Sequence, residues 1–197
     1  MMLIRVALLA LLANTAAAAA TVDVQVRGPD GRPVPDAVVM VSVARAPAGP
    51  IKFPWPYVMK QQNISFQPHV LIVPVGATVA FPNLDRVRHH VYSFSKAKKF
   101  QLALYGQDET KTVVFDHAGV IALGCNIHDT MSGFVVAVDT PYAAKTDAAG
   151  HVSIADVPPG AATLQVWHTM VRAPGNLMAQ PITLPAAGLA RTIAIGS

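Results

Sequence analysis

Apolar and polar residues alternate in short runs along most of the chain after residue 20, and Gly, Pro, Asp and Asn separate the runs. An alternation with a period of two is typical of half-buried β-strands, and the 3.6-residue period of an amphipathic helix is nearly absent. The proline-rich stretch 46–63 breaks the alternation and is predicted to be irregular. Strands are predicted within 21–43 and 69–83, two in each, and at 89–94, 111–116, 119–125, 133–139, 150–157, 162–168, 179–184 and 190–195. Many short strands at this spacing predict an all-β chain, built as a sandwich or barrel.

The first 20 residues do not share this pattern. A short basic start, an apolar run and a small-residue tail are typical of a secretory signal peptide, here predicted to be cleaved after Ala20. The apolar run is too short to span a bilayer, which disfavours a retained membrane anchor. The mature chain is therefore expected in a bacterial periplasm, with no membrane span.

Charge and cysteine content narrow the possible functions. Removing Arg5 with the leader takes the formal net charge from +4 to +3, and the only dense basic cluster is Lys96, Lys98 and Lys99, so nucleic-acid binding is not predicted. The chain has one cysteine, Cys125, which cannot form an internal disulfide. In an oxidising compartment a free thiol is a liability unless it is buried or bound to a metal, so Cys125 is a candidate ligand.

The sequence around this cysteine, GCNIHDTM, adds His128 and Met131 at intervals of three residues. A mononuclear electron-transfer copper site takes two imidazoles and a thiolate in a plane, with a weak axial thioether. The missing imidazole must come from another strand end, and His89 and His90 both stand at the start of the predicted strand 89–94. The residues alone leave that choice open. Zinc is a lesser candidate, because it prefers harder ligands than a thioether.

Two stretches, VGATVAFPNLDRVRHHV and FDHAGVIALGCNIHDTMSGFVVAV, carry a resemblance to a known family. The region 62–139 resembles the cupredoxins, the blue copper proteins, of the amicyanin and plastocyanin type. The resemblance implies a Greek-key β-sandwich with one type 1 copper (Cu⁺/Cu²⁺) site. It assigns the ligands as His89, Cys125, His128 and Met131. His89 is preferred because relatives carry an asparagine after the ligand, where this chain has His90. Asn83 is expected to hydrogen-bond the ligand loop and hold the thiolate in place.

A second resemblance covers both sides of this region. VQVRGPDGRPVPDAVVMVSV and AKTDAAGHVSIADVPPGAATLQVWH resemble the smaller carboxypeptidase regulatory-like, or transthyretin-like, β-sandwich. The predicted organisation is a signal peptide at 1–20, a cupredoxin domain at 49–139, and a split regulatory-like sandwich made from 21–48 and 140–197. Domain insertion is tolerated where the ends of the inserted domain lie close together. In the alternative, 21–48 supplies the first cupredoxin strands and the C-terminal domain is separate.

The predicted function is that of a periplasmic one-electron carrier. The relatives that resemble the whole chain are methylamine utilization proteins or plastocyanin-like proteins, which implies a cytochrome c or a periplasmic dehydrogenase as redox partner. Enzymatic activity is not expected, because a site with four protein ligands has no open position for a substrate. Two alternatives are a copper-handling protein that passes metal rather than electrons, and a binding module in which the copper is structural.

Overall fold

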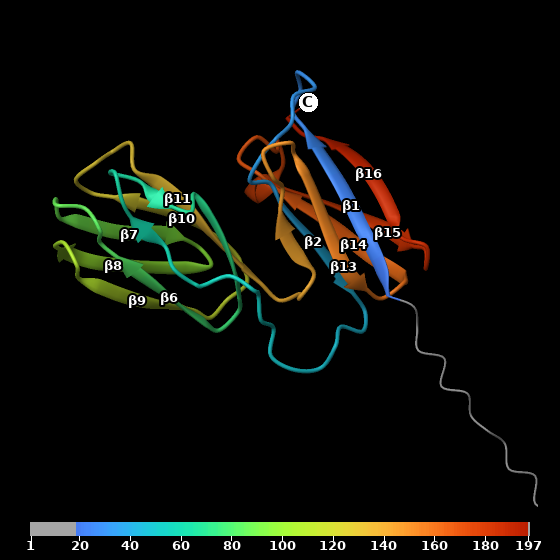
Figure 1. The fold of residues 1–197 in the computed structure, drawn as a ribbon, viewed down its shortest axis with the longest axis horizontal. Helices are drawn as coiled ribbons and strands as arrows, with labels where there is room; N and C mark the ends of the chain where they lie inside the picture. Colours follow the sequence, from blue (N-terminus) through green and yellow to red (C-terminus); the bar gives the residue numbers. More distant parts are fainter. Residues whose placement is uncertain (1–18, 197) are drawn as a thin grey trace, which may run out of the picture.

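The computed structural model describes residues 19–196. These residues form sixteen strands and one short 3-10 helix, η1 (Pro174–Asn176), so the predicted all-β class is confirmed (Figure 1). The predicted leader lies outside the described residues except for Ala19 and Ala20, and Ala20 opens the first strand. In the described part of the chain, no helix is long and apolar enough to cross a membrane.

One body of the molecule, which we call the central sandwich, is built from residues 60–138. A five-stranded sheet in the order β5-β11-β10-β7-β8 packs against the pair β6-β9, and the small hairpin β3-β4 lies beside them. Alternate side chains of both sheets point inward and form one apolar core, which includes Phe81, Phe115 and Ile121. The strands are β3 (Lys60–Gln61), β4 (Phe66–Gln67), β5 (Val70–Pro74), β6 (Ala77–Pro82), β7 (His89–Ser95), β8 (Lys98–Tyr105), β9 (Thr110–Phe115), β10 (Gly119–Cys125) and β11 (Ser132–Val138).

The other body, the flanking sandwich, combines strands from both ends of the chain. Its sheets have the orders β13-β1-β16 and β12-β2-β14-β15, so the first two strands pair only with strands that follow residue 140. Its core is aliphatic apart from Tyr142. The strands are β1 (Ala20–Arg27), β2 (Val38–Val43), β12 (Ala143–Lys145), β13 (His151–Val157), β14 (Gly160–Trp167), β15 (Leu177–Leu184) and β16 (Leu189–Ala194).

The chain leaves and re-enters the flanking sandwich at one place. The Thr140 hydroxyl donates to the Val41 carbonyl at 2.6 Å, and the Val41 N–H donates to the Tyr142 carbonyl at 2.8 Å. The chain therefore leaves the flanking sandwich near Val41 and returns to it at the adjacent Thr140, and residues 44–59 run between the bodies as an irregular connection (Figure 1). This geometry is the one that a domain insertion requires.

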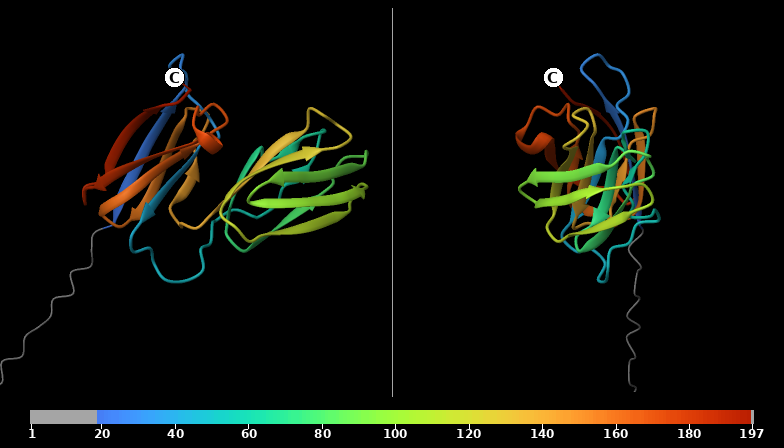
Figure 2. Two further views of the ribbon diagram at one scale, coloured as in Figure 1. Left: turned by 180° about the vertical axis from the view of Figure 1, so that it is seen from behind. Right: turned by 90° about the vertical axis from the view of Figure 1, so that its left-hand side faces the viewer.

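A third apolar cluster joins the two bodies. It combines Val38 and Trp167 of the flanking sandwich with Ile72 and Val136 of the central one, all buried. The Trp167 ring meets the Phe134 ring edge-on, with centroids 5.0 Å apart. The left view in Figure 2 shows the flanking sandwich at one end of the central body and the β10–β11 loop at the other end.

Candidate metal centre

Neighbouring strand ends bring the predicted ligands together. His89 is the first residue of β7 and Cys125 is the last residue of β10, and these antiparallel strands pair at Cys125↔Val91. The loop to β11 carries His128 and Met131, and the Met131 N–H donates to the His128 carbonyl at 2.9 Å in a tight turn. An antiparallel pair places the start of one strand beside the end of its partner, so His89 and Cys125, 36 residues apart, meet here.

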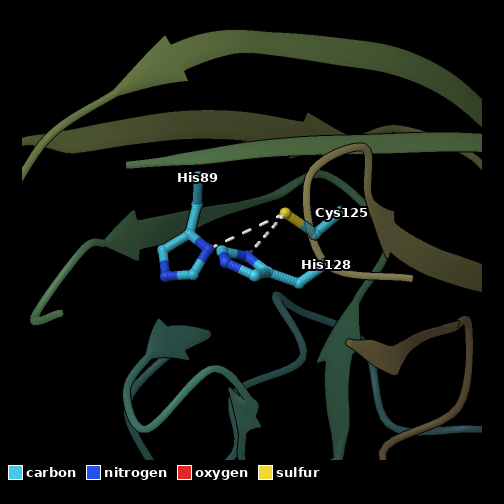
Figure 3. A group of neighbouring side chains, drawn as sticks. All are labelled: His89, Cys125 and His128. Carbon is cyan, nitrogen blue, oxygen red and sulfur yellow. Dashed lines mark hydrogen bonds between the residues drawn. The ribbon is translucent and has the colours of Figure 1, made fainter. Parts of the chain in front are cut away.

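The donor atoms surround a common point. The Cys125 sulfur lies 3.7 Å from Nδ1 of His89 and 3.7 Å from Nδ1 of His128 (Figure 3). All three donor atoms lie within 4.8 Å of one another. Metal bonds of about 2.0 Å to nitrogen and about 2.3 Å to sulfur, meeting at about 120°, separate N and S by about 3.7 Å. The arrangement therefore fits one metal ion in a trigonal His-Cys-His plane.

Burial differs among the four predicted ligands. His89, Cys125 and Met131 are buried, whereas His128 is only half-buried. Cys125 and Met131 belong to the same apolar core cluster, which excludes water from their side of the site. One edge of the site is thus open to the surface at His128. The role of Met131 as axial ligand stays a prediction.

The geometry separates His89 from His90. Successive side chains of a strand point to opposite faces, so only one of the two can face the core. His89 points inward with Val91 and Ser93, while His90 lies on the outer face, where its ring contacts Tyr92 at 6.2 Å between centroids. The buried Nδ1 of His90 has no hydrogen-bond partner. His89 is the histidine that reaches Cys125.

Asn83 does not have the role that the sequence predicts. Its side-chain N–H groups donate to the carbonyls of Val87 and Tyr105, at 2.9 and 3.1 Å, and its side-chain oxygen accepts the Asp85 N–H. With both amide hydrogens used in this way, Asn83 closes the 83–87 loop that leads into His89. The expected bond to the cysteine loop was wrong, because the amide is short and already occupied by its own loop.

The Asp85 carboxylate, which the sequence did not predict as part of the site, contacts a predicted ligand. Its Oδ2 lies 2.9 Å from Nε2 of His89, on the side of the ring opposite the thiol. Burial raises the pKa of Asp85, but hydrogen bonds from His89 and from two backbone N–H groups outweigh it, so the pKa lies below its ordinary value. An acid four residues before a histidine was the available signal, and in a loop that spacing has no fixed geometry.

Tyr105 and Gln61 form a buried polar pair beside the site that the sequence also did not predict. The Tyr105 hydroxyl donates to the Gln61 side chain and contacts the Phe81 carbonyl at 3.0 Å. The β7–β8 register slips by one residue between His89↔Tyr105 and Val91↔Leu102. This bulge exposes Leu104 and turns Tyr105 inward, opposite His89. Burial raises the pKa of the Tyr105 hydroxyl far above its ordinary value.

Comparisons with known proteins find solved structures of low similarity. No family model and no curated protein matches the chain. A copper-containing nitrite reductase from Thermus scotoductus SA-01 is 27% identical over 49% of this chain and 25% of its own, with a TM-score of 0.40. An oxidised amicyanin variant is 21% identical over 41% of this chain and 80% of its own, with a TM-score of 0.39. A purple cupredoxin from Nitrosopumilus maritimus is 25% identical over 41% of this chain and 96% of its own, with a TM-score of 0.37.

This chain thus spans a quarter of the length of the nitrite reductase. At TM-scores of 0.40 and below these likenesses establish no family, and the assignment of function rests on the site itself.

Proposed function

We propose that this chain is a type 1 copper protein that carries single electrons between redox partners. The observation that carries the proposal is the buried Cys125 sulfur at 3.7 Å from two imidazole nitrogens, since this donor set and spacing fit a trigonal copper site. Copper bound there would supply one-electron redox chemistry between its Cu⁺ and Cu²⁺ states. Met131 is proposed as the weak axial ligand, and no enzymatic step is proposed at this site.

The protein residues would hold the donors in nearly one geometry for both oxidation states. His89 and Cys125 are fixed on paired strands, and the core packed around them resists rearrangement. Little movement on gain or loss of an electron keeps the cost of reorganisation low. The half-buried His128 places one edge of the site near the surface, where an electron can pass to or from another protein.

The surface at this end supports a protein partner. Four apolar side chains from the loops around the site are 40–50% exposed: Ile64, Leu84, Val87 and Ile127. Exposed apolar side chains gathered in one region are typical of protein–protein contact sites. Arg86 and Arg88 are also exposed here, and they favour a partner with acidic side chains. A cytochrome c or a periplasmic dehydrogenase is the proposed class of partner.

The remaining proposals concern location and organisation. We propose that residues 1–20 direct export to the periplasm, and that residues 49–139 are a cupredoxin domain inserted into a transthyretin-like sandwich. Two observations support the insertion. β1 and β2 pair with strands that follow residue 140, and the chain leaves and re-enters the flanking sandwich at adjacent residues, Val41 and Tyr142. The flanking sandwich would serve in adhesion, docking or stability.

Reconstitution with Cu²⁺ tests the function. The loaded protein is expected to show an intense visible thiolate charge-transfer band and reversible one-electron voltammetry. The Cys125→Ser variant should lose the band, because the thiolate is its source. A colourless, redox-silent copper complex would favour copper handling. A coloured protein that exchanges no electrons with cytochrome c, and keeps its fold only with copper bound, would favour structural copper.

A further inference from the structure

The Asp85 carboxylate joins two parts of the molecule that are distant in sequence. Its Oδ1 accepts the Asn63 N–H at 2.7 Å, and its Oδ2 accepts the Ile64 N–H at 3.0 Å. The same Oδ2 lies 2.9 Å from Nε2 of the buried His89. The Asp85 side chain is 12% exposed, so little water competes for these contacts. One carboxylate therefore connects the β3–β4 turn to a residue of the metal site.

The turn that holds this carboxylate has an unusual backbone. Asn63 and Ile64 have φ values of 56° and 53°, and the Gln62 N–H donates to the Ser65 carbonyl, as in a two-residue hairpin turn. A left-handed conformation is costly for a β-branched residue such as Ile64. Here it directs two consecutive N–H groups at one anion, an arrangement known to bind negative charge. Contacts with the carboxylate offset the strain.

We infer that Asp85 is a positioning residue that fixes His89 for the metal and stabilises the oxidised site. The inference rests on the proposed function, which it deepens. An ionised carboxylate only accepts hydrogen bonds, so the shared proton belongs to Nε2 of His89. Nδ1 is then left with a free lone pair directed at the space beside the Cys125 sulfur. Rotation of the imidazole breaks its contact with Asp85, and the carboxylate cannot follow the ring without losing its two bonds to the turn.

The charge of Asp85 has a second effect. A carboxylate on the far nitrogen makes an imidazole a stronger donor, and a stronger donor favours the more highly charged metal ion. Loss of such a partner typically costs 10–100-fold in metal affinity. If the Cu²⁺ state loses about tenfold more affinity than the Cu⁺ state, the one-electron potential rises by about 59 mV.

The test compares Asp85→Asn with Asp129→Asn in the full chain. Asp129 is exposed and adjacent to His128, so its variant removes the same charge near the site without touching His89. Cu²⁺ affinity is measured by competition with a chelator, and the potential by voltammetry. For Asp85→Asn we expect a 10–100-fold weaker Cu²⁺ affinity and a raised potential, with smaller changes for Asp129→Asn. Equal changes in the two variants would reduce the effect to net charge and overturn the inference.

A measurement on the unaltered protein avoids dependence on folding of the variant. In the ¹⁵N-labelled Cu⁺ protein, the Nε2–H of His89 should give a slowly exchanging imidazole resonance with a contact to the turn amides of Asn63 and Ile64. An unprotonated Nε2 or a rapidly exchanging proton would contradict the assignment. Ile64→Gly, which keeps the N–H donor and removes the strain, should retain the resonance and the potential. Failure of the proposed function appears separately, as the absence of a visible band in the wild-type copper protein.

Discussion

The two sandwiches of this molecule are built from the same alternation, yet they bury different side chains. The flanking sandwich encloses aliphatic side chains and Tyr142, and its buried Thr140 and Thr146 bond only to backbone groups. The central sandwich buries Gln61, Asn83 and His89 near one end of its core, together with the Tyr105 hydroxyl and the Cys125 sulfur. Buried polar groups cost stability unless they are satisfied, so a cluster of them marks a candidate functional site.

The largest test of this contrast removes one body entirely. Excising residues 50–139 and joining the ends with a short turn should leave a folded, colourless β-sandwich, because β1 and β2 find all their partners outside the excised part. The excision uncovers Val38 and Trp167, so a lower Tm than that of the full chain is expected. Circular dichroism and copper titration measure the outcome. An unfolded product would mean that the flanking sandwich is not an independent unit.

A second test addresses the contact between the bodies. Trp167→Ala removes a buried ring that packs on Phe134, and substitutions of this kind cost about 3–5 kcal/mol in unfolding free energy. The visible spectrum should not change, because Phe134 lies on β11 beyond the ligand loop. Denaturant unfolding and absorption spectroscopy on one sample measure both. A shifted copper band would show that the contact between the two bodies also affects the metal site.

A third test uses alkaline pH, to which the two cores should respond differently. Tyr105 is neutral and buried, with its pKa raised above the ordinary value of 10.0, whereas its hydroxyl in the unfolded chain ionises near that value. The unfolded state then releases the proton first, so stability is full below pH 10 and falls above it by up to about 1.4 kcal/mol per pH unit. Tyr105→Phe should flatten this fall. An unchanged slope in the variant would assign the loss to other groups.

The smallest expected effect concerns the predicted axial ligand. Met131→Leu keeps the packing volume and should keep the visible band, because the thiolate of Cys125 is untouched. Loss of a weak donor removes more stabilisation from Cu²⁺ than from Cu⁺, so the potential should rise by tens of millivolts, given about 59 mV per tenfold change. Voltammetry measures the shift. A potential identical to that of the wild type would remove Met131 from the ligand set.

The sequence predicted the strands and the metal ligands better than it predicted the residues that contact those ligands. Alternation and turn residues predicted most strands, and the spacing of Cys125 and His128 predicted a shared metal. The strand Lys98–Tyr105 was not predicted, because it begins within the basic cluster at 96–99. The inward turn of Tyr105 depends on a bulge, which is a relation between two strands and has no signature in either one.

The contacts of Asp85 could not be predicted from the sequence for a related reason. Its three acceptor contacts come from a turn more than 20 residues earlier and from a histidine four residues later. No local periodicity links such partners. The choice of His89 over His90, in contrast, follows from the alternation of the strand once its inner face is known.

The chain leaves the flanking sandwich at Val41 and returns to it at the adjacent Tyr142, and this arrangement has a consequence for the order of folding. β1 pairs with β13 and β16, which are synthesised more than 100 residues later. Long-range pairing of this kind is slow because a long loop must close. The central sandwich contains all its own partners and can fold first. Once folded, it fixes residues 60 and 138 relative to each other, which shortens the loop that must close between β2 and β12. The body that holds the candidate metal site would thus act as the nucleus on which the other body assembles.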